Sequence, residues 1–340
     1  MEDVAARAGV SRALVSIVFR DQPGASAQTR RRILAAADRI GYRPDHRARL
    51  LGRKHTGLVG VSFGVRHTFH GDLVEALYAT AEARGFEVAL SAVTPSRDER
   101  TAVDALQAYR CEALILLGPA LSEDELMALG RHVPVVTVAR SLSSQAWSTG
   151  RVNVVRTDDS AGAALAVEQL VELGHTEVWH VDGGRAPGAT ERRRGYRAAM
   201  KRAGLAAHVL AGGQTEERGA ASAELLLSER RPPTAVTVFN DRSAVGLLDT
   251  LRRGGIHAPA DISVIGYDDD RVARLPSVDL TTVRQDTARL AVSAVDQAVA
   301  RLAGGRPRET VIAPELVLRS TTAPLTGHNL ADTPPEAGKS

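Results

Sequence analysis

The sequence predicts an α/β protein in which a small helical N-terminal segment precedes a body of two similar lobes, each built on a parallel sheet. The chain has 340 residues, more than one compact unit usually holds. The first 43 residues contain only helical patterns. From Leu58 onward, short apolar runs alternate with amphipathic stretches in two successive series. Such alternation is typical of parallel strands that are covered by helices on both faces.

The N-terminal segment contains two short helical patterns that meet at a tight turn. Gly9 can adopt the positive φ that this turn needs, and the hydroxyl of Ser11 can cap the helix that follows. A third helix is predicted to begin at Ser26 and to run to Ile40, where Gly41 ends it. Two helices joined by a short turn that contains glycine form the helix-turn-helix pattern.

Basic residues are concentrated in this segment. Residues 1–55 contain twelve arginines and lysines against five acidic residues, a net charge of +7, while the rest of the chain carries −4. A basic head on a mildly acidic body indicates that the head binds phosphate groups. A helical cap without a ligand is the alternative interpretation, and the charge separation disfavours it.

The body divides into two series of strands and helices, separated by the polar stretch Ser141–Gly150. Strands are predicted at Leu58–Phe63, Glu87–Val93, Ala113–Leu117, Val133–Val138, Val152–Thr157, Glu177–Asp182, His208–Leu210, Ala235–Phe239, Ser263–Tyr267, Glu309–Ile312 and Leu316–Leu318. Helices are predicted at Asp72–Arg84, Arg97–Tyr109, Glu123–Arg131, Ser160–Leu173, Thr190–Ala203, Glu216–Ser228, Ser243–Arg253 and Thr287–Leu302.

Several other protein classes are disfavoured. Cys111 is the single cysteine, so no internal disulfide framework can form. The sequence has no apolar stretch of membrane-spanning length and no export signal, which predicts a cytoplasmic protein without membrane contact. His67 and His70 have too few companion ligands for a metal site. No dinucleotide fingerprint or catalytic constellation is found, so we expect neither a cofactor nor enzymatic activity.

An ordered set of residues runs through the first 61 positions: Asp3-Val4-Ala5, Ala8-Gly9-Val10-Ser11, Val15-Ser16, Ser26, Thr29-Arg30, Gly41-Tyr42, Pro44, Ala48-Arg49, Leu51, Thr56 and Gly60. With this set, residues 2–61 resemble the DNA-binding headpiece of the lactose-repressor (LacI/GalR-type) family of bacterial transcription regulators. The resemblance extends to about residue 323. It implies a helix-turn-helix headpiece and a two-lobe, periplasmic-binding-protein-like body with parallel sheets.

The resemblance also implies the domain organisation. The headpiece takes residues 1–43, and a hinge helix with its linker takes residues 44–56. The body takes residues 57–323, with a first lobe formed by about 57–154 and 287–313 and a second by about 155–284 and 315–323. Residues 324–340 contain few apolar side chains and are predicted to be a disordered tail.

DNA contacts are assigned by the same resemblance. They are Ser11, Arg12, Ala13, Ser16, Ile17, Arg20, Ser26 and Thr29, with Ala48 and Leu51 in the hinge. Leu51 is expected to wedge into the minor groove and kink the DNA, and packing of Leu51 on the body is the alternative. Leu14, Ile17 and Arg20 stand where the family often has Thr, Arg and Asn. Ala13 and Ile17 can therefore contact thymine methyl groups, and the family's operator sequences do not transfer.

Polar residues follow several predicted strands, where open parallel sheets bind ligands. The resemblance assigns an effector pocket between the lobes, with the candidates Phe69, His70, Arg192, Asn240, Asp268 and Gln285. Trp147 is a further candidate for stacking on a sugar. A structural role is the alternative for each: a turn for Asp268, or the core for Phe69 and Trp147.

Taken together, the resemblance implies a ligand-responsive, sequence-specific transcription regulator, most often a repressor in this family. It would bind a pseudo-palindromic, double-stranded operator DNA as a homodimer or a dimer of dimers. A small-molecule effector, a sugar or a related metabolite, would bind between the lobes and change the affinity for DNA. The alternative is a small-solute sensor on the same scaffold that does not bind DNA.

Overall fold

The computed structural model describes residues 1–19, 21–43, 55–148 and 150–325. The chain forms two compact units, Met1–Thr56 and Gly57–Ser340. Several predictions fall outside the described residues: the contacts by Arg20, Ala48 and Leu51, the hinge over residues 44–54, and the tail beyond Leu325.

The first unit is a headpiece of three helices. They are α1 (Glu2–Ala8), α2 (Arg12–Phe19) and α3 (Ala27–Arg39). Gly9 ends α1 with a φ of 58° and a ψ of 44°, the left-handed conformation predicted for this turn. The hydroxyl of Ser11 accepts a hydrogen bond from the backbone N–H of Leu14 at 3.3 Å. Ser26 caps α3 by accepting from the backbone N–H of Thr29 at 3.1 Å. The turn and both caps therefore form as the sequence predicts.

Small apolar side chains pack the three headpiece helices together. The buried set is Val4, Ala5, Ala8, Val15, Val18, Ile33, Ala36 and Ala37. Arg30 from α3 supports the loop after α2, because it pairs with Asp21 at 2.5 Å and donates to the carbonyl of Gln22 at 3.1 Å. One of the twelve basic residues of this region thus has an internal, structural role.

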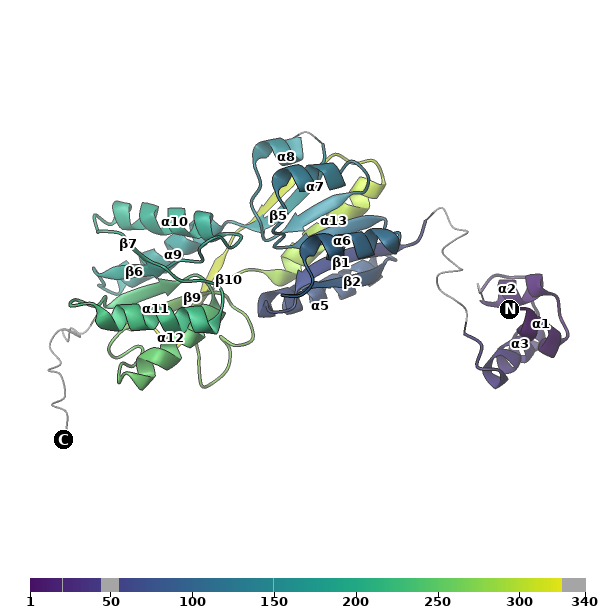
Figure 1. Cartoon of the computed structure of the whole chain (residues 1–340), viewed down its shortest axis with the longest axis horizontal. Helices are drawn as coiled ribbons and strands as arrows, with labels where there is room; N and C mark the ends of the chain where they lie inside the picture. The colour runs from purple at the N-terminus through teal and green to yellow at the C-terminus, as the bar shows by residue number, and fades with distance from the viewer. Residues whose placement is uncertain (20, 44–54, 149, 326–340) are drawn as a thin grey trace. The chain divides into compact units, whose positions relative to one another are not determined.

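Two six-stranded sheets form the second unit (Figure 1). The first has the order β11-β5-β4-β3-β1-β2, with β1 at Leu58–Gly64, β2 at Glu87–Val93, β3 at Ala113–Leu117, β4 at Val135–Val138, β5 at Val152–Thr157 and β11 at Glu309–Ile312. The second has the order β12-β10-β9-β8-β6-β7, with β6 at Val178–Val181, β7 at His208–Leu210, β8 at Ala235–Val238, β9 at Ser263–Asp268, β10 at Thr282–Arg284 and β12 at Glu315–Val317. All neighbouring strands are parallel except β10 and β12.

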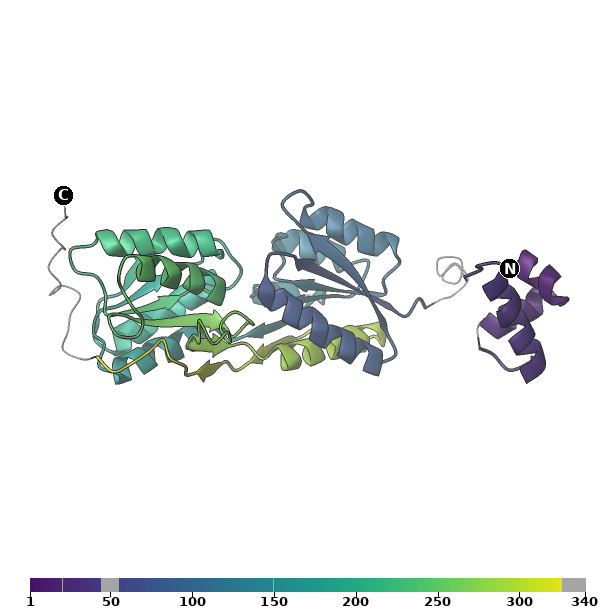
Figure 2. The same cartoon turned by 90° about the horizontal axis from the view of Figure 1, so that it is seen from below.

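Helices cover both faces of each sheet (Figure 2). The first sheet carries α5 (Thr68–Ala83), α6 (Glu99–Ala108), α7 (Glu123–Leu129), α8 (Ser144–Ser148) and α13 (Thr287–Leu302). The second carries α9 (Asp159–Glu172), α10 (Ala189–Arg202), α11 (Glu216–Ser228) and α12 (Asp241–Arg253). Each sheet and its helices bury two apolar clusters, one per face, which is the packing of a lobe.

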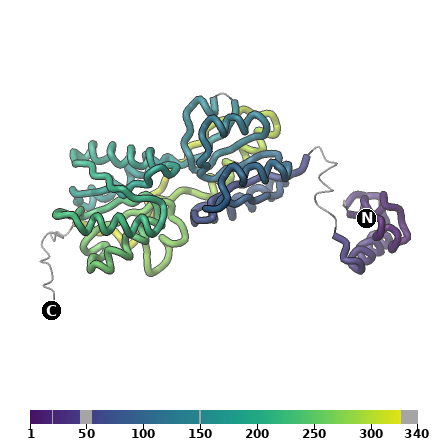
Figure 3. The backbone as a smooth tube through the Cα atoms, viewed as in Figure 1, coloured from purple at the N-terminus to yellow at the C-terminus, as the bar shows by residue number. Residues whose placement is uncertain are grey.

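The chain crosses between the lobes at three places within the described residues: after β5, after β10 and after β11 (Figure 3). Each crossing is only a few residues long. The C-terminal strands are therefore divided, with β11 in the first sheet and β12 in the second. Short connections of this kind allow two rigid lobes to rotate about a common hinge.

Three differences from the prediction concern α5, α8 and β10. The sequence predicts a helix from Asp72, but α5 begins at Thr68 and so includes Phe69 and His70. Gly71 interrupts the apolar pattern there and has a low helix propensity. Packing of Phe69 in the core outweighs that cost, so the helix begins earlier than predicted. The polar stretch Ser141–Gly150 also contains a short helix, α8. In the second lobe, β10 (Thr282–Arg284) is a strand where none was predicted.

Helices α11 and α12 approach each other through two glycines. A Cβ on Gly219 would lie 1.8 Å from the carbonyl oxygen of Ser243, and a Cβ on Gly246 would lie 1.9 Å from that of Glu216. Backbone atoms cannot rotate away as a side chain can. Only glycine therefore allows this helix spacing.

We expect Gly246→Ala to lower the free energy of unfolding by about 1–3 kcal/mol, because the added methyl group forces the two helices apart. Gly71→Ala is the matched control, since a Cβ at this helical position meets no atom within 4 Å. The control should leave stability unchanged or raise it by up to about 1 kcal/mol. Urea unfolding measures both, and equal stabilities of the two variants would contradict the close-contact interpretation.

Candidate functional site

A cavity of about 300 Å³ lies between the two lobes. Its wall includes residues at or just after the carboxyl ends of strands from both sheets: Gly64, Val93, Leu117, Gly118, Phe239 and Asp268. All six predicted effector residues, Phe69, His70, Arg192, Asn240, Asp268 and Gln285, line this one cavity. Residues far apart in sequence thus meet at the place where open parallel sheets bind ligands. Their contact with an effector stays a prediction.

Arg192 is the central cation of the site. It comes from α10, and its side chain is 6% exposed. Its Nε donates to Asp159 at 2.8 Å, one terminal nitrogen donates to the carbonyl of Phe239 at 2.5 Å, and the other reaches Asp268 at 3.5 Å. The guanidinium also lies 3.6 Å from the centre of the Tyr267 ring, a cation–π contact. The group is therefore held from several directions before any ligand arrives.

Burial and charge act in opposite directions on these groups. Burial alone would lower the pKa of Arg192, but the carboxylates of Asp159 and Asp268 outweigh it and raise that pKa. Burial likewise raises the pKa of Asp159 although Arg192 opposes it. Buried charges of this kind persist only when they are paired.

Asp268 combines an unusual backbone with an unusual pKa. Its φ is 112°, in the region that non-glycine residues rarely adopt, which places strain at the cavity wall. Its carboxylate accepts from the Nε2 of Gln285 at 2.7 Å. Burial raises its pKa to about 7, against the opposing effect of Arg192. Near neutral pH this group can therefore both accept and donate hydrogen bonds to a ligand.

On the opposite side of the cavity lies His70, from α5. Its Nδ1 accepts from the backbone N–H of Gly64 at 3.1 Å. Burial, with a smaller effect of His67, lowers its pKa to about 3, so the ring is neutral at neutral pH. With Nδ1 acting as the acceptor, the proton lies on Nε2, which lies next to Gly118 in the cavity wall. His70 thus offers a hydrogen-bond donor.

Asn240 and Phe69 each have a structural role as well as a place in the cavity wall. Asn240 caps α12 by accepting from the N–H of Ser243 at 3.0 Å and donates to the carbonyl of Gln214 at 3.1 Å. Phe69 packs in the core of the first lobe. Trp147, the further stacking candidate, does not line this cavity and packs against a different core cluster of that lobe.

Sequence reasoning missed other residues of the site. Glu99, Gln214 and Phe239 line the cavity, and Asp159 pairs with Arg192 from behind. Asp159 could have been found as an acidic residue at a helix start that faces the Arg192 helix. Glu99 begins α6, while Gln214 and Phe239 follow β7 and β8, and no local pattern distinguishes these three residues.

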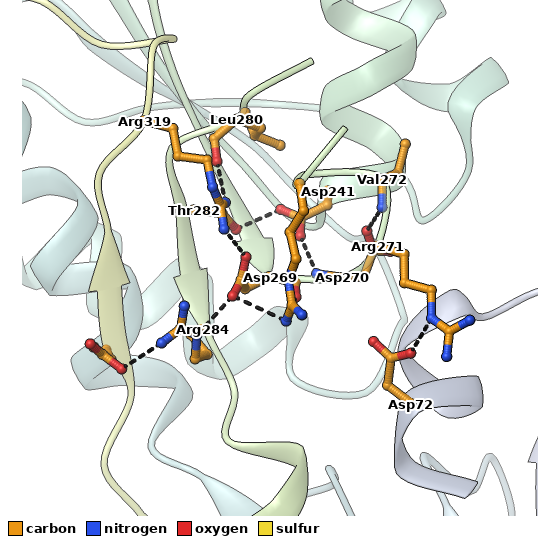
Figure 4. A network of polar contacts seen from close by, with 12 residues as sticks. Asp72, Asp241, Asp269, Asp270, Arg271, Val272, Leu280, Thr282, Arg284 and Arg319 are labelled. Atoms are coloured by element: carbon orange, nitrogen blue, oxygen red, sulfur yellow. Dashed lines mark hydrogen bonds and ion pairs between the residues drawn. The ribbon is translucent and has the colours of Figure 1, made fainter. Parts of the chain in front are cut away.

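The two residues after Asp268 anchor the cavity wall (Figure 4). Asp269 is fully buried and pairs with Arg284 at 2.7 Å and with Arg319 at 2.6 Å. Burial opposes ionisation, but these arginines lower the pKa of Asp269. Asp241 accepts from Thr282 at 2.6 Å and from the N–H of Asp270 at 2.9 Å. The turn after β9 is thereby fixed to the second lobe.

In the headpiece, the predicted DNA contacts lie on or beside α2 and at the start of α3. Arg12 and Ala13 are exposed, and Ser16 and Ile17 are half-buried. Arg12 pairs with Glu2 at 3.2 Å across an exposed surface, an interaction weak enough to exchange for phosphate. Ser11 and Ser26 are exposed, and Thr29 is half-buried.

Known proteins match both units. Residues 1–45 match the model of bacterial regulatory proteins, lacI family, and residues 167–322 match that of the periplasmic binding protein-like domain. The HTH-type transcriptional regulator GalR of Escherichia coli (strain K12) is 33% identical over 334 residues, which cover 95% of each chain. The chain belongs to the lacI family of bacterial regulatory proteins.

Solved structures agree with this assignment. The LacI transcriptional regulator from a Rhodococcus species is 51% identical and covers 78% of this chain and 98% of its own, with a TM-score of 0.76. The lac repressor dimer bound to operator and the anti-inducer ONPF is 30% identical and covers 94% and 98%, with a TM-score of 0.80. The present LacI-family chain is thus a DNA-binding transcription regulator with an effector-binding body, and not an enzyme. No helix in the described part of the chain has the length and apolar character needed to cross a membrane.

The raised pKa of Asp268 predicts a pH dependence of stability. Its pKa is about 7 in the folded protein against 3.8 for an ordinary aspartate, so folding favours the protonated form. The resulting stability is fully present below about pH 4 and is lost as the pH rises to about 7. We expect the free energy of unfolding to fall relative to that of Asp268→Asn across this range, and the difference to be constant above it. Urea unfolding at several pH values measures this, and parallel profiles would contradict it.

Proposed function

We propose that this LacI-family protein is a homodimeric repressor that binds a pseudo-palindromic operator and responds to a sugar or related metabolite in the interlobe cavity. The observation that carries the proposal is the cavity itself. It joins Arg192 and Asp268 of one lobe to His70 and Phe69 of the other, so its shape depends on how the lobes are oriented. A ligand that prefers one orientation changes the population of the two states.

The cavity chemistry favours a neutral, hydroxylated ligand. Arg192 is already paired with Asp159 and Asp268, so it has no spare positive charge for an anionic ligand. Asp268 accepts hydrogen bonds and His70 donates one, which suits hydroxyl groups. Phe69 and Phe239 supply an apolar wall for a sugar face.

For the DNA, the proposal assigns base reading to α2, the second helix of the helix-turn-helix, which in proteins of this kind lies in the major groove. Arg12, Ala13, Ser16 and Ile17 would contact the bases, while Ser11, Ser26 and Thr29 would contact phosphates or the flanking base. Arg20 and the hinge residues Ala48 and Leu51 complete the assignment as sequence-based predictions, since they lie outside the described residues. Residues 1–43, 44–56 and 57–323 are proposed as headpiece, hinge and body.

A mobility-shift titration with the full-length protein tests the proposal. Operator duplexes are first selected from random DNA. We expect them to contain two inverted half-sites and to bind as one dimer per duplex. We also expect the affinity to fall steeply as salt rises, because phosphate contacts release counterions. A ligand found by thermal-shift screening of neutral sugars, sugar acids and purines should change operator affinity at least about tenfold.

Asp268→Asn tests the role of the cavity in the response to the effector. It keeps the shape of the side chain but removes the carboxylate, so it should lose the ligand response and bind the operator like the parent protein. Absence of DNA binding at low salt would refute the regulator. Ligand binding that never alters operator affinity would refute the effector role.

The side chains of α2 that are proposed to contact bases predict an operator that is recognised in part through its thymines. Ala13 is exposed, Ile17 is half-buried, and neither can form the bidentate hydrogen bonds by which arginine reads guanine. Replacing a contacted thymine by deoxyuridine removes one methyl group. We expect this to weaken operator binding about fourfold, the value of one buried methyl group, as measured by competition in the mobility-shift assay.

Replacing guanines by 7-deazaguanine is the control, since it removes the N7 acceptor that arginine would use. Ile17→Ala should lose sensitivity at the thymine that Ile17 contacts. Deoxyuridine is placed at every half-site thymine position in turn. If none of these changes weakens binding while the protein still binds the operator, the proposed thymine contacts are wrong, but the proposal of DNA binding is unaffected.

A further inference from the structure

One turn carries both a cavity residue and contacts that cross between the lobes. Asp268 lines the cavity. Asp269, the next residue, is fully buried among arginines of its own lobe. Asp270 and Arg271 then reach α5 in the other lobe. Four consecutive residues thus combine a ligand-facing group, an anchor and two residues that contact the other lobe.

The interlobe contacts are made with α5, and Figure 4 shows the one between Arg271 and Asp72. Arg271 Nε pairs with Asp72 at 2.8 Å, and its terminal nitrogen pairs with Glu75, three residues further along the helix, at 2.7 Å. The hydroxyl of Thr68, one turn earlier, donates to the carboxylate of Asp270. The side chain of Asp72 is only 16% exposed, so this ion pair is shielded more than an ordinary surface pair.

Each partner moves with its own lobe. The backbone N–H of Asp270 donates to buried Asp241 at 2.9 Å, which fixes the turn to α12. On the other side, α5 packs through Leu73 and Leu77 into the core of the first lobe. A change in the angle between the lobes must therefore break or remake the contacts of Arg271.

The same two segments also form facing walls of the cavity. Helix α5 carries Phe69 and His70 beside the Thr68 that contacts Asp270. The turn carries Asp268 beside Asp269 and Asp270. Closing the cavity therefore also forms the interlobe contacts, because the same two segments make both.

We propose that Asp270 and Arg271 are positioning residues for the cavity: they hold the turn that carries Asp268 against α5 and so stabilise the closed arrangement of the lobes. The interpretation of the cavity as the effector site rests on the proposed function, but the lobe-closing role does not. The contacts of Arg271 are partly exposed, with the arginine 71% exposed. Their strength is therefore modest and sensitive to salt, which allows a ligand to shift the balance between open and closed forms.

The test measures the separation of the lobes in the full-length protein without ligand or DNA. Spin labels are attached to cysteines introduced at two exposed positions, Gln107→Cys on α6 and Glu224→Cys on α11. The native Cys111 is buried, and burial raises its pKa to about 11, so it resists labelling. Labelled chains are diluted with unlabelled chains, and distances are measured by double electron–electron resonance.

In Arg271→Gln we expect the population with widely separated labels to rise about three- to tenfold relative to the parent protein. Arg271→Lys keeps the charge and should restore most of the closed population. Sodium chloride at about 1 M should shift the parent protein towards the open form and leave Arg271→Gln unchanged, because the variant lacks the pairs of Arg271 with Asp72 and Glu75 that salt would screen.

Arg252→Gln is the matched control. Arg252 is similarly exposed, at 67%, but pairs with Asp249 on its own helix. Equal distance distributions in Arg271→Gln and the parent protein, or equal opening in Arg252→Gln, would overturn the positioning role. Failure of the operator titration would refute the proposed function and leave this result untouched.

Discussion

The effector-binding body depends on one buried cation. Arg192 is almost inaccessible to solvent, and a buried guanidinium is stable only while its carboxylate and carbonyl partners stay in place. Those partners come from the start of α9, the end of β8 and the end of β9. A single side chain thereby ties three separate elements of the second lobe together at the cavity wall. The geometry of the site is consequently set before a ligand binds, which lowers the cost of ordering it.

The two units of this LacI-family regulator use charge in different ways. Among the described residues of the headpiece, most arginines are exposed, and phosphates can there replace weak partners such as Glu2. In the body the decisive charges are buried and paired, as Asp269 is with Arg284 and Arg319. Exposed charge gives affinity for a polyanion. Buried, paired charge gives defined geometry at the cavity wall.

Part of the candidate site could be predicted from sequence because the end of a strand marks a place in space. Residues just after parallel strands meet at one sheet edge, and this rule placed Asp268 and Asn240 correctly beside the cavity. Asp159 was missed because its role comes from a contact with Arg192, which lies on the next helix. Trp147 resembles a stacking residue in sequence, but the fold directs it to a different cluster. Such distinctions depend on contacts between distant segments.

By itself, the sequence determined the order and type of most elements, because apolar periodicity and capping residues such as Gly9 and Ser26 act over a few neighbouring positions. The short elements α8 and β10 were not predicted, because five and three residues are too few to show a clear periodicity. The sequence also determined the family, through an ordered set of headpiece residues. Local patterns do not encode strand pairing, so only the family resemblance implied that the last two strands belong to different lobes. The tertiary structure shows the pairing itself, with β11 beside β5 and β12 beside β10. It likewise decided that Arg30 supports a loop, that α5 begins at Thr68 and that Arg271 spans the lobes. Each of these depends on which segments meet, and that is settled by packing of the whole chain.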